Sequence, residues 1–180
     1  MPSDNAHELV LTRLAQGLPA VTPAFGAALA EAGAICFEDQ NHSNGVELKV
    51  EGTFTAKYNV YWQVVTDQMR RCWNDPEVTT EYAAYGVAFL LIRNLTEYTV
   101  ISRRRKRGGF DYWLGKDEDE LPFQKKARLE VSGIRKGDLS RVKARVKQKL
   151  DQVSPSDRLG LPAYIVVVEF SQPLSQVVKK

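Results

Sequence analysis

A run of eight residues near the end of the chain, AYIVVVEF at 163–170, constrains the possible folds most strongly. All but one of these residues are apolar, which is typical of a strand buried on both faces in a sheet that helices cover from both sides. The run follows the segment 138–153, in which Val142 and Val146 belong to an apolar stripe at helical spacing. A helix followed by a buried strand predicts parallel pairing through a right-handed crossover. The expected fold is therefore α/β, with a mixed central sheet flanked by helices.

The segments before this run complete a recognisable order of elements. Asp75 is a suitable N-cap and Pro76 suits the first helical turn, so a helix is expected over 74–96. The expected elements after it are strands at 97–103, 110–114 and 125–134, the helix at 138–153 and the strand at 163–170. Residues 75–180 are thus predicted to form an α-β-β-β-α-β core.

Residues 1–74 are predicted to form an N-terminal helix and strand extension packed on this core. The expected elements are helices at 4–18 and 22–40, the second capped by Thr22, and strands at 46–54 and 58–65. The last ten residues, 171–180, are predicted to be a frayed or appended tail.

Positive charge is concentrated in one part of a chain of 180 residues whose net charge is only +3. Residues 101–150 carry 16 Lys and Arg against 7 Asp and Glu, whereas the rest of the chain carries 9 against 15. Such clustering favours contact with a polyanion, although a solvated basic face is the simpler alternative. No apolar run reaches the roughly 20 residues of a membrane span. With two widely spaced cysteines, a cytoplasmic protein without a disulfide framework is expected.

Two carboxylates lie on neighbouring strands of the predicted core. Asp111 stands in GGFDYWLG, and Glu130 stands in ARLEVSG. The period of two places Arg128, Glu130 and Ser132 on one face of their strand. If the two carboxylates meet at one edge of the sheet, they suit Mg²⁺ or Mn²⁺, because a site for a softer metal would need more than two histidines or paired cysteines.

This order of elements, with an aspartate on one strand and a glutamate on the next, resembles the PD-(D/E)xK, or restriction-endonuclease-like, nuclease superfamily over roughly residues 75–170. The resemblance implies a divalent-metal nuclease with Asp111 and Glu130 as metal ligands. It also implies an auxiliary acid from the preceding helix, Glu81 or Glu77. A defence or repair role is the expectation that follows from the fold analogy alone.

The chain departs from this pattern at Ser132, where the family places a lysine that stabilises charge at the attacked phosphate. Lys126 and Arg128, or Gln148 and Lys149 on the following helix, are the candidates to supply a polar or basic group instead. The residues expected to hold a nucleic-acid backbone are Arg103, Arg104, Arg105, Lys106, Arg107, Arg141, Arg145 and Lys149.

Two alternatives stay open at this point. The carboxylates of Asp111 and Glu130 can instead form ordinary ion pairs with nearby basic residues, and Glu47 with Lys49 offers a second Glu-x-Lys pair. A rival function also stays open, a catalytically inactive interaction subunit that docks on an acidic protein partner through residues 101–150, and in which the missing lysine reflects a lost activity. A protein partner or a homo-oligomer is compatible with either reading.

Overall fold

The computed structural model describes residues 6–105, 109–118 and 121–180. The helices are η1 (Leu11–Gln16), α1 (Pro23–Asp39), α2 (Asp67–Cys72), α3 (Pro76–Leu95), α4 (Leu139–Val153) and η2 (Ser154–Leu159), where η marks a 3-10 helix. The strands are β1 (His7–Val10), β2 (Val46–Gly52), β3 (Ala56–Tyr61), β4 (Thr99–Arg103), β5 (Tyr112–Gly115), β6 (Ala127–Ile134), β7 (Ala163–Glu169) and β8 (Leu174–Lys179). Within this part of the chain, no helix combines the length and apolar character that a membrane span requires.

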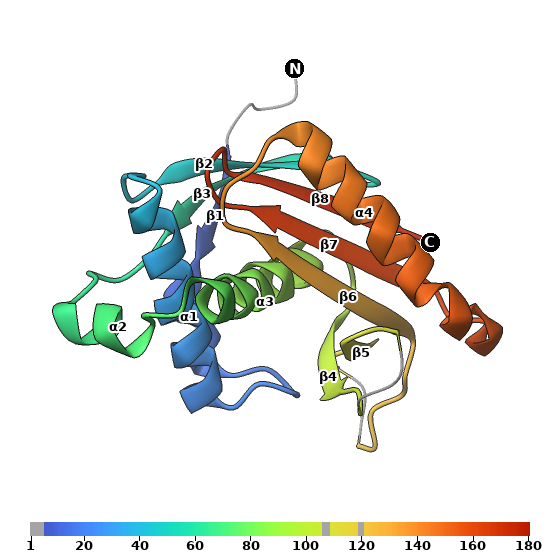
Figure 1. Ribbon diagram of the computed structural model, residues 1–180. Helices are drawn as coiled ribbons and strands as arrows, with labels where there is room; N and C mark the ends of the chain where they lie inside the picture. Colours follow the sequence, from blue (N-terminus) through green and yellow to red (C-terminus); the bar gives the residue numbers. More distant parts are fainter. Residues whose placement is uncertain (1–5, 106–108, 119–120) are drawn as a thin grey trace.

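The strands form a single mixed sheet of eight in the order β1-β3-β2-β8-β7-β6-β5-β4. This confirms the predicted α/β class, and the order α3-β4-β5-β6-α4-β7 matches the expected core. β6 and β7 pair in parallel on either side of α4 in the sequence, as the buried run at 163–170 predicts. β4, β5 and β6 pair antiparallel in sequence order. Figure 1 shows α4 crossing from the end of β6 back to the start of β7.

The prediction of a frayed tail at 171–180 is wrong. β8 lies between β7 and β2, antiparallel to the first and parallel to the second. Val177 is fully buried, and Ser175 and Gln176 are buried beside it. β8 therefore connects β1, β2 and β3 to the predicted core in one continuous sheet. The sequence of β8 is short and contains several polar residues, so it does not indicate a buried central strand. The strands that bury it come from other parts of the chain.

The prediction of a helix at 4–18 is also wrong. The segment forms β1, which pairs in parallel with β3, followed by η1. Leu11 and Leu14 are buried three residues apart, and this spacing fits a 3-10 helix as well as an α-helix. The side-chain pattern alone does not separate these two structures, and the pairing of β1 with the sheet decides between them.

Capping side chains set the starts of the three longest helices at the positions expected from the sequence. The Thr22 hydroxyl accepts a hydrogen bond from the Phe25 amide at 3.2 Å. Asp75 accepts from the amides of Glu77 and Val78, at 2.9 and 3.1 Å, and Pro76 follows as the first residue of α3. Each cap satisfies backbone donors that the first helical turn leaves without partners.

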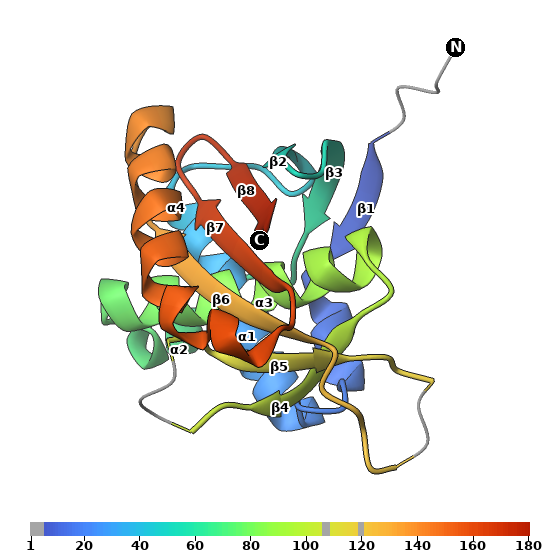
Figure 2. The ribbon, with the colours of Figure 1, turned by 90° about the vertical axis from the view of Figure 1, so that its right-hand side faces the viewer.

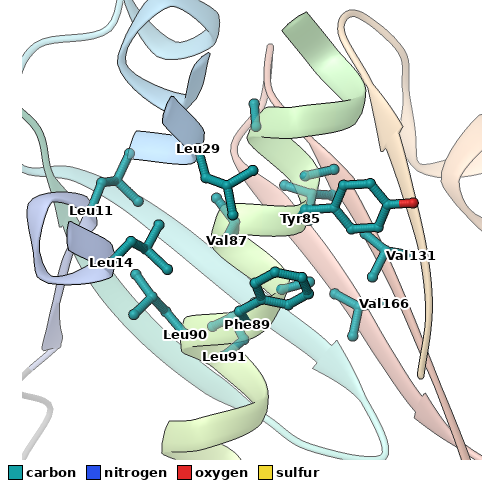
Figure 3. Packing of buried hydrophobic residues seen from close by; sticks show 14 of the residues in the cluster. Leu11, Leu14, Leu29, Tyr85, Val87, Phe89, Leu90, Leu91, Val131 and Val166 are labelled. Atoms are coloured by element: carbon teal, nitrogen blue, oxygen red, sulfur yellow. The ribbon is translucent and has the colours of Figure 1, made fainter. Parts of the chain in front are cut away.

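The sheet separates two hydrophobic layers, as Figures 1 and 2 show. Residues of α1 and α3 pack on one face and those of α4 on the other. β7 alternates between the layers: Val166 and Val168 pack on the α3 side, and Ile165 and Val167 on the α4 side. Figure 3 shows the larger layer, in which Phe89 of α3 lies near Val166. The apolar sequence of β7 is explained by this burial on both faces.

Candidate active site

A cleft of about 450 Å³ opens where the edge of β6 extends past the end of β5. β5 pairs with β6 only from Ala127 to Leu129, whereas β6 continues to Ile134 alongside β7. The N-terminal half of α3 forms one wall of the cleft and the basic face of α4 forms the other. Gly133 permits this arrangement, because a Cβ atom there would lie 2.6 Å from the backbone oxygen of Thr80 on α3.

Backbone contacts fix Asp111 at this edge. The residue directly precedes β5, and its amide donates to the Leu129 carbonyl at 2.8 Å. The carboxylate accepts a hydrogen bond from the Val131 amide, also at 2.8 Å. The backbone of Asp111 therefore extends the pairing of β5 with β6 by one residue, and its side chain bonds to the next amide available on β6. These two bonds hold the carboxyl group at the cleft.

Glu130 lies on the side of β6 that faces α4 and is 1% exposed. Its Oε1 atom accepts hydrogen bonds from Lys149 Nζ at 2.6 Å and from Gln152 Nε2 at 3.0 Å. Its Oε2 atom is buried and has no hydrogen-bond partner among the described residues. An unsatisfied buried carboxylate oxygen is costly, so this atom is a natural ligand for a cation.

The carboxyl groups of Asp111 and Glu130 are close enough for each to influence the pKa of the other. Burial raises the pKa of Glu130 to about 7, and the charge of Asp111 acts in the same direction. Burial likewise raises the pKa of Asp111. Two ionised carboxylates repel each other and can only accept hydrogen bonds, so a buried neighbouring pair favours a retained proton or a bound cation.

The donor set fits a hard divalent cation. Mg²⁺ and Mn²⁺ accept oxygen ligands, and Mg²⁺ commonly takes only one or two protein carboxylates and completes its shell with water and phosphate oxygens. In the described parts of the chain, no three His, Cys, Asp or Glu side chains gather closely enough to hold a metal ion. Glu81 and Glu77 line the same cleft from α3 without joining the two carboxylates in such a group.

Lys149 brings a positive charge to the acid pair. It is one of the helical candidates to replace the lysine missing at position 132, and its ammonium forms an ion pair with Glu130. Its charge lowers the pKa of both Asp111 and Glu130 and so opposes the effect of burial. Ser132 instead accepts a hydrogen bond from Arg145 at 2.7 Å, which directs this arginine to the cleft. Gln148, the other helical candidate, is exposed and does not line the cleft.

Arg128 lies away from the cleft, although it shares a strand face with Glu130. It is 2% exposed, pairs with Asp157 at 3.0 Å, and donates to the Ser156 hydroxyl and the Leu161 carbonyl beneath η2. Alternation along β6 places Arg128 on the correct face, but two residues from Glu130 along the strand means about 7 Å of displacement. Its contacts are those of a structural residue.

The remaining basic candidates lie on two sides of Asp111. Arg141, Arg145 and Lys149 line the cleft already described. Arg103, Arg104 and Arg105 line a second cleft of about 480 Å³, which shares Asp111, Glu81 and Tyr85 with the first. Lys106 and Arg107 fall outside the described residues. The alternative pair Glu47 and Lys49 lies on β2, away from both clefts, where Glu47 pairs with Lys57.

Three further residues belong to the site although the sequence analysis does not name them. Tyr85 follows Glu81 by one helical turn, lines the cleft beside Asp111, and lowers the pKa of that carboxyl group. Burial raises the pKa of Tyr85 itself, so the hydroxyl stays a donor. Gln152 follows Lys149 by three residues. Helical spacing from the named residues is the signal that finds both.

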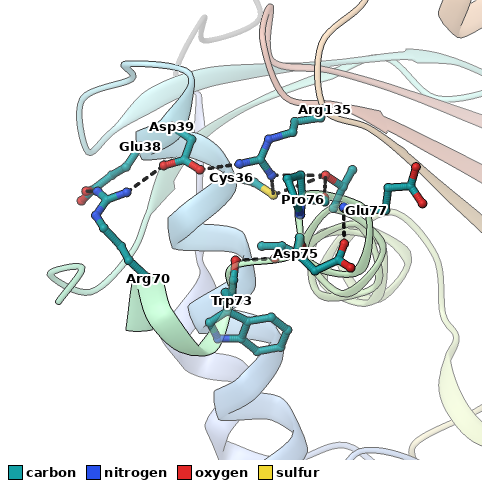
Figure 4. A network of polar contacts seen from close by, with 11 residues as sticks. Cys36, Glu38, Asp39, Arg70, Trp73, Asp75, Pro76, Glu77 and Arg135 are labelled. Atoms are coloured by element: carbon teal, nitrogen blue, oxygen red, sulfur yellow. Dashed lines mark hydrogen bonds and ion pairs between the residues drawn. The ribbon is translucent and has the colours of Figure 1, made fainter. Parts of the chain in front are cut away.

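Arg135 is the third, and it joins the cleft to the neighbouring helices. It directly follows β6, lines the cleft, and forms an ion pair with Asp39 at the end of α1. It also donates to the Thr80 hydroxyl at 3.4 Å, and Arg70 of α2 pairs with Asp39 at 2.7 Å (Figure 4). Sequence spacing offers no signal for this residue, because its partners lie 55 and 96 residues away.

Among the described residues, the cleft is therefore lined by three acids, one lysine and three arginines, and Glu130, which is buried and paired with Lys149, does not itself line it. Their arrangement is the available guide to what the chain does. In comparisons with known proteins, no protein-family model matches the chain, and no curated protein or solved structure shows significant similarity to it.

Proposed function

We propose that this chain is a divergent metal-dependent nuclease of the PD-(D/E)xK type, or a nucleic-acid-binding protein built on the same site. The observation that carries the proposal is the position of Asp111 in the lining of an open cleft, close enough to the buried Glu130 to raise the pKa of that residue, with Lys149 of the same cleft bound to Glu130. The alternative of two ordinary ion pairs holds for Glu130, which pairs with a lysine of α4, but not for Asp111. Asp111 forms no ion pair with a described basic residue, and Glu130 keeps one oxygen without a partner in the same part of the chain.

Asp111 and Glu130 are the residues that would hold Mg²⁺ or Mn²⁺. When bound, such an ion polarises a phosphoryl oxygen and lowers the pKa of a coordinated water. The Val131 amide orients the Asp111 carboxylate. Gln152 and Lys149 orient that of Glu130, so both acids are held in place before substrate arrives.

Lys149 supplies the charge that Ser132 lacks. Its ammonium carries three donors and uses two of them on Glu130 and Gln152, at 2.6 and 3.0 Å. The third is available to an oxygen of a phosphate in the cleft. Negative charge that develops on that phosphate during attack is then stabilised by a fixed positive group, which is the role of the family lysine.

The arginines on the cleft walls would hold the backbone on either side of the cleaved bond. Arg141 and Arg145 approach from α4, and the arginines at the end of β4 and directly after it approach from the other side of Asp111. Because these contacts are made to phosphates, binding is expected to weaken steeply as salt rises.

A cleavage assay with matched variants tests the proposal. The purified protein is expected to nick plasmid DNA or cut RNA with Mg²⁺ or Mn²⁺, and to do neither with a chelator. Asp111→Asn and Glu130→Gln keep the shapes of the side chains and are each expected to abolish cleavage. Asp151→Asn removes an exposed acid from the same helix as Lys149 and is expected to leave it unchanged.

Two results would contradict the nuclease. Cleavage that survives both Asp111→Asn and Glu130→Gln would show that the activity comes from elsewhere. A protein that binds an acidic protein partner, shows little sensitivity to salt and cuts no nucleic acid with either metal would instead be an interaction subunit.

A further inference from the structure

The second cleft differs from the first in its walls. It combines Arg103, Arg104 and Arg105 with the aromatic side chains of Tyr82, Tyr85 and Phe110. Its volume of about 480 Å³ is in the range of sites that take small organic ligands. Asp111 lies in the lining of both clefts. A nucleic-acid strand that passes over Asp111 in the first cleft would therefore enter the second cleft next.

Aromatic faces hold two of these arginines in place. The Arg104 guanidinium lies 4.1 Å from the centre of the Phe110 ring, and that of Arg103 lies 5.4 Å from the centre of the Tyr112 ring. A guanidinium that lies over a ring keeps its N–H groups directed outward along its edges. Both side chains are therefore fixed without their hydrogen-bonding capacity being used by a carboxylate.

The lack of acidic partners separates these arginines from others in the molecule. Arg70, Arg93, Arg128 and Arg135 each form an ion pair with an aspartate. Among the described residues, no carboxylate oxygen lies within 4.0 Å of a guanidinium nitrogen of Arg103, Arg104 or Arg105. One Arg104 nitrogen is buried and has no hydrogen-bond partner in the same part of the chain. Positive groups arranged in this way match an anion that is supplied from outside.

The aromatic lining selects among anions. Tyr82 is half-buried at the cleft, and the centre of its ring lies 5.9 Å from that of Phe25 and 5.5 Å from that of Trp73, which fixes its orientation. An unpaired nucleobase stacks on such a ring, whereas a base inside a duplex has both faces covered by its neighbours. A simple phosphate or an acidic peptide would leave this wall unused.

We propose that the second cleft binds one nucleotide of a single-stranded segment, with its phosphate on Arg103 and Arg104 and its base against Tyr82. The substrate is then a nucleic acid that is unpaired next to the position of cleavage. This inference rests on the proposed function for the statement that cleavage occurs beside the cleft, but the binding itself requires no metal.

Binding measured with a chelator present tests the inference apart from any cleavage. The probes are a short fluorescently labelled single-stranded DNA, a duplex of the same sequence, and a strand with the same backbone but without bases. Fluorescence anisotropy is expected to show tighter binding of the single strand than of the duplex. Tyr82→Ala is expected to weaken binding of the single strand about tenfold, but to change binding of the strand without bases little.

The arginines are tested through the salt dependence. Arg103→Ala combined with Arg104→Ala is expected to lower the slope of log affinity against log salt by about 0.7 for each phosphate that the variant no longer binds. Arg71→Ala removes an exposed charge that lines neither cleft and is expected to leave the slope unchanged. Tyr82→Phe keeps the ring, so near-normal binding of this variant would show that the weaker binding of Tyr82→Ala comes from stacking. Arg103→Lys keeps the charge and is expected to keep the slope.

Equal binding of single strand and duplex, or equal effects of Tyr82→Ala on strands with and without bases, would overturn the inference. The outcome is separable from that of the proposed function. A protein that binds single strands through these residues but never cleaves would keep this site and lose the nuclease. A protein that cleaves nucleic acid, but whose arginine variants bind single strands as tightly as the wild type, would keep the nuclease and lose this binding site.

Discussion

At the scale of single residues, the acid pair has a direct consequence for the stability of the protein. Asp111 and Glu130 lie near each other in a largely buried site, which disfavours their charged forms. The charge of Lys149 offsets only part of this effect on their pKa values. Without a cation, the pair retains a proton that either residue would lose in the unfolded chain. The site is therefore arranged for a bound ion at the expense of the stability of the metal-free protein.

The pH dependence of stability measures this cost. The pKa of Glu130 rises on folding from its ordinary value of 4.5 to about 7, so the folded protein binds the proton more tightly. The contribution of this group to stability is then complete below the lower value and is lost as pH rises through the interval. In denaturant unfolding with a chelator, Glu130→Gln is expected to flatten this decline relative to the wild type, and Asp151→Asn is expected to preserve it. A wild-type curve parallel to that of Glu130→Gln would contradict the raised pKa.

Replacement of Lys149 tests whether this residue stabilises charge on the phosphate during cleavage or only helps to assemble the metal site. Lys149→Met removes the ammonium but keeps much of the apolar stem, and cleavage is expected to fall about a hundredfold because a transition-state donor is lost. Lys149→Arg is expected to recover part of the rate. Binding of the metal should change far less than the rate, and single-turnover kinetics with a parallel metal titration compares the two. Full activity in Lys149→Met would exclude this residue from the role.

At the scale of elements, the close approach of α3 to β6 positions the walls of the cleft. Gly133→Ala would place a Cβ atom 2.6 Å from the Thr80 backbone oxygen, which can move only with α3 itself. We expect a loss of unfolding free energy of about 1–3 kcal/mol. The control, Gly137→Ala, meets only the flexible Arg141 chain and Ile134 at 3.0 Å, so a smaller loss is expected. Chemical denaturation compares the two, and equal losses would show that the approach is not the constraint.

The sequence predicts those elements whose signals are local. Asp75 and Asp138 cap helices at the positions that the neighbouring sequence indicates. β7 is predicted correctly because its run of apolar residues identifies it without knowledge of its partner strands. β1 and β8 are missed because each is defined by strands that lie far away in the chain. The residue pattern of a short strand does not predict which strand it pairs with.

The same distinction applies to the site. Asp111 and Glu130 are found from their places on consecutive strands, and Lys149 from the helix that follows. Arg128 shows the limit of such reasoning, because alternation gives the face of a strand but not the position of the cleft along it. Arg135 depends on a contact with α1 that no local pattern encodes.

At the scale of the whole molecule, one sheet joins the N-terminal strands to the core through β8. Residues 1–74 and 75–180 are therefore expected to unfold together. Trp113→Phe leaves Trp62 and Trp73 as fluorescent reporters of the first part, while far-ultraviolet circular dichroism reports both parts. The two transitions are expected to coincide in denaturant. An earlier fluorescence transition would show that the N-terminal part unfolds independently.

The central claim is that Asp111 and Glu130 hold one divalent cation between them. Calorimetric titration with Mn²⁺ above neutral pH, where Glu130 can give up its proton, tests it most directly. The wild type and Asp151→Asn are expected to bind a single ion with the same affinity, and Asp111→Asn and Glu130→Gln to lose that binding. No binding by the wild type, or binding that both substitutions leave intact, would contradict the account.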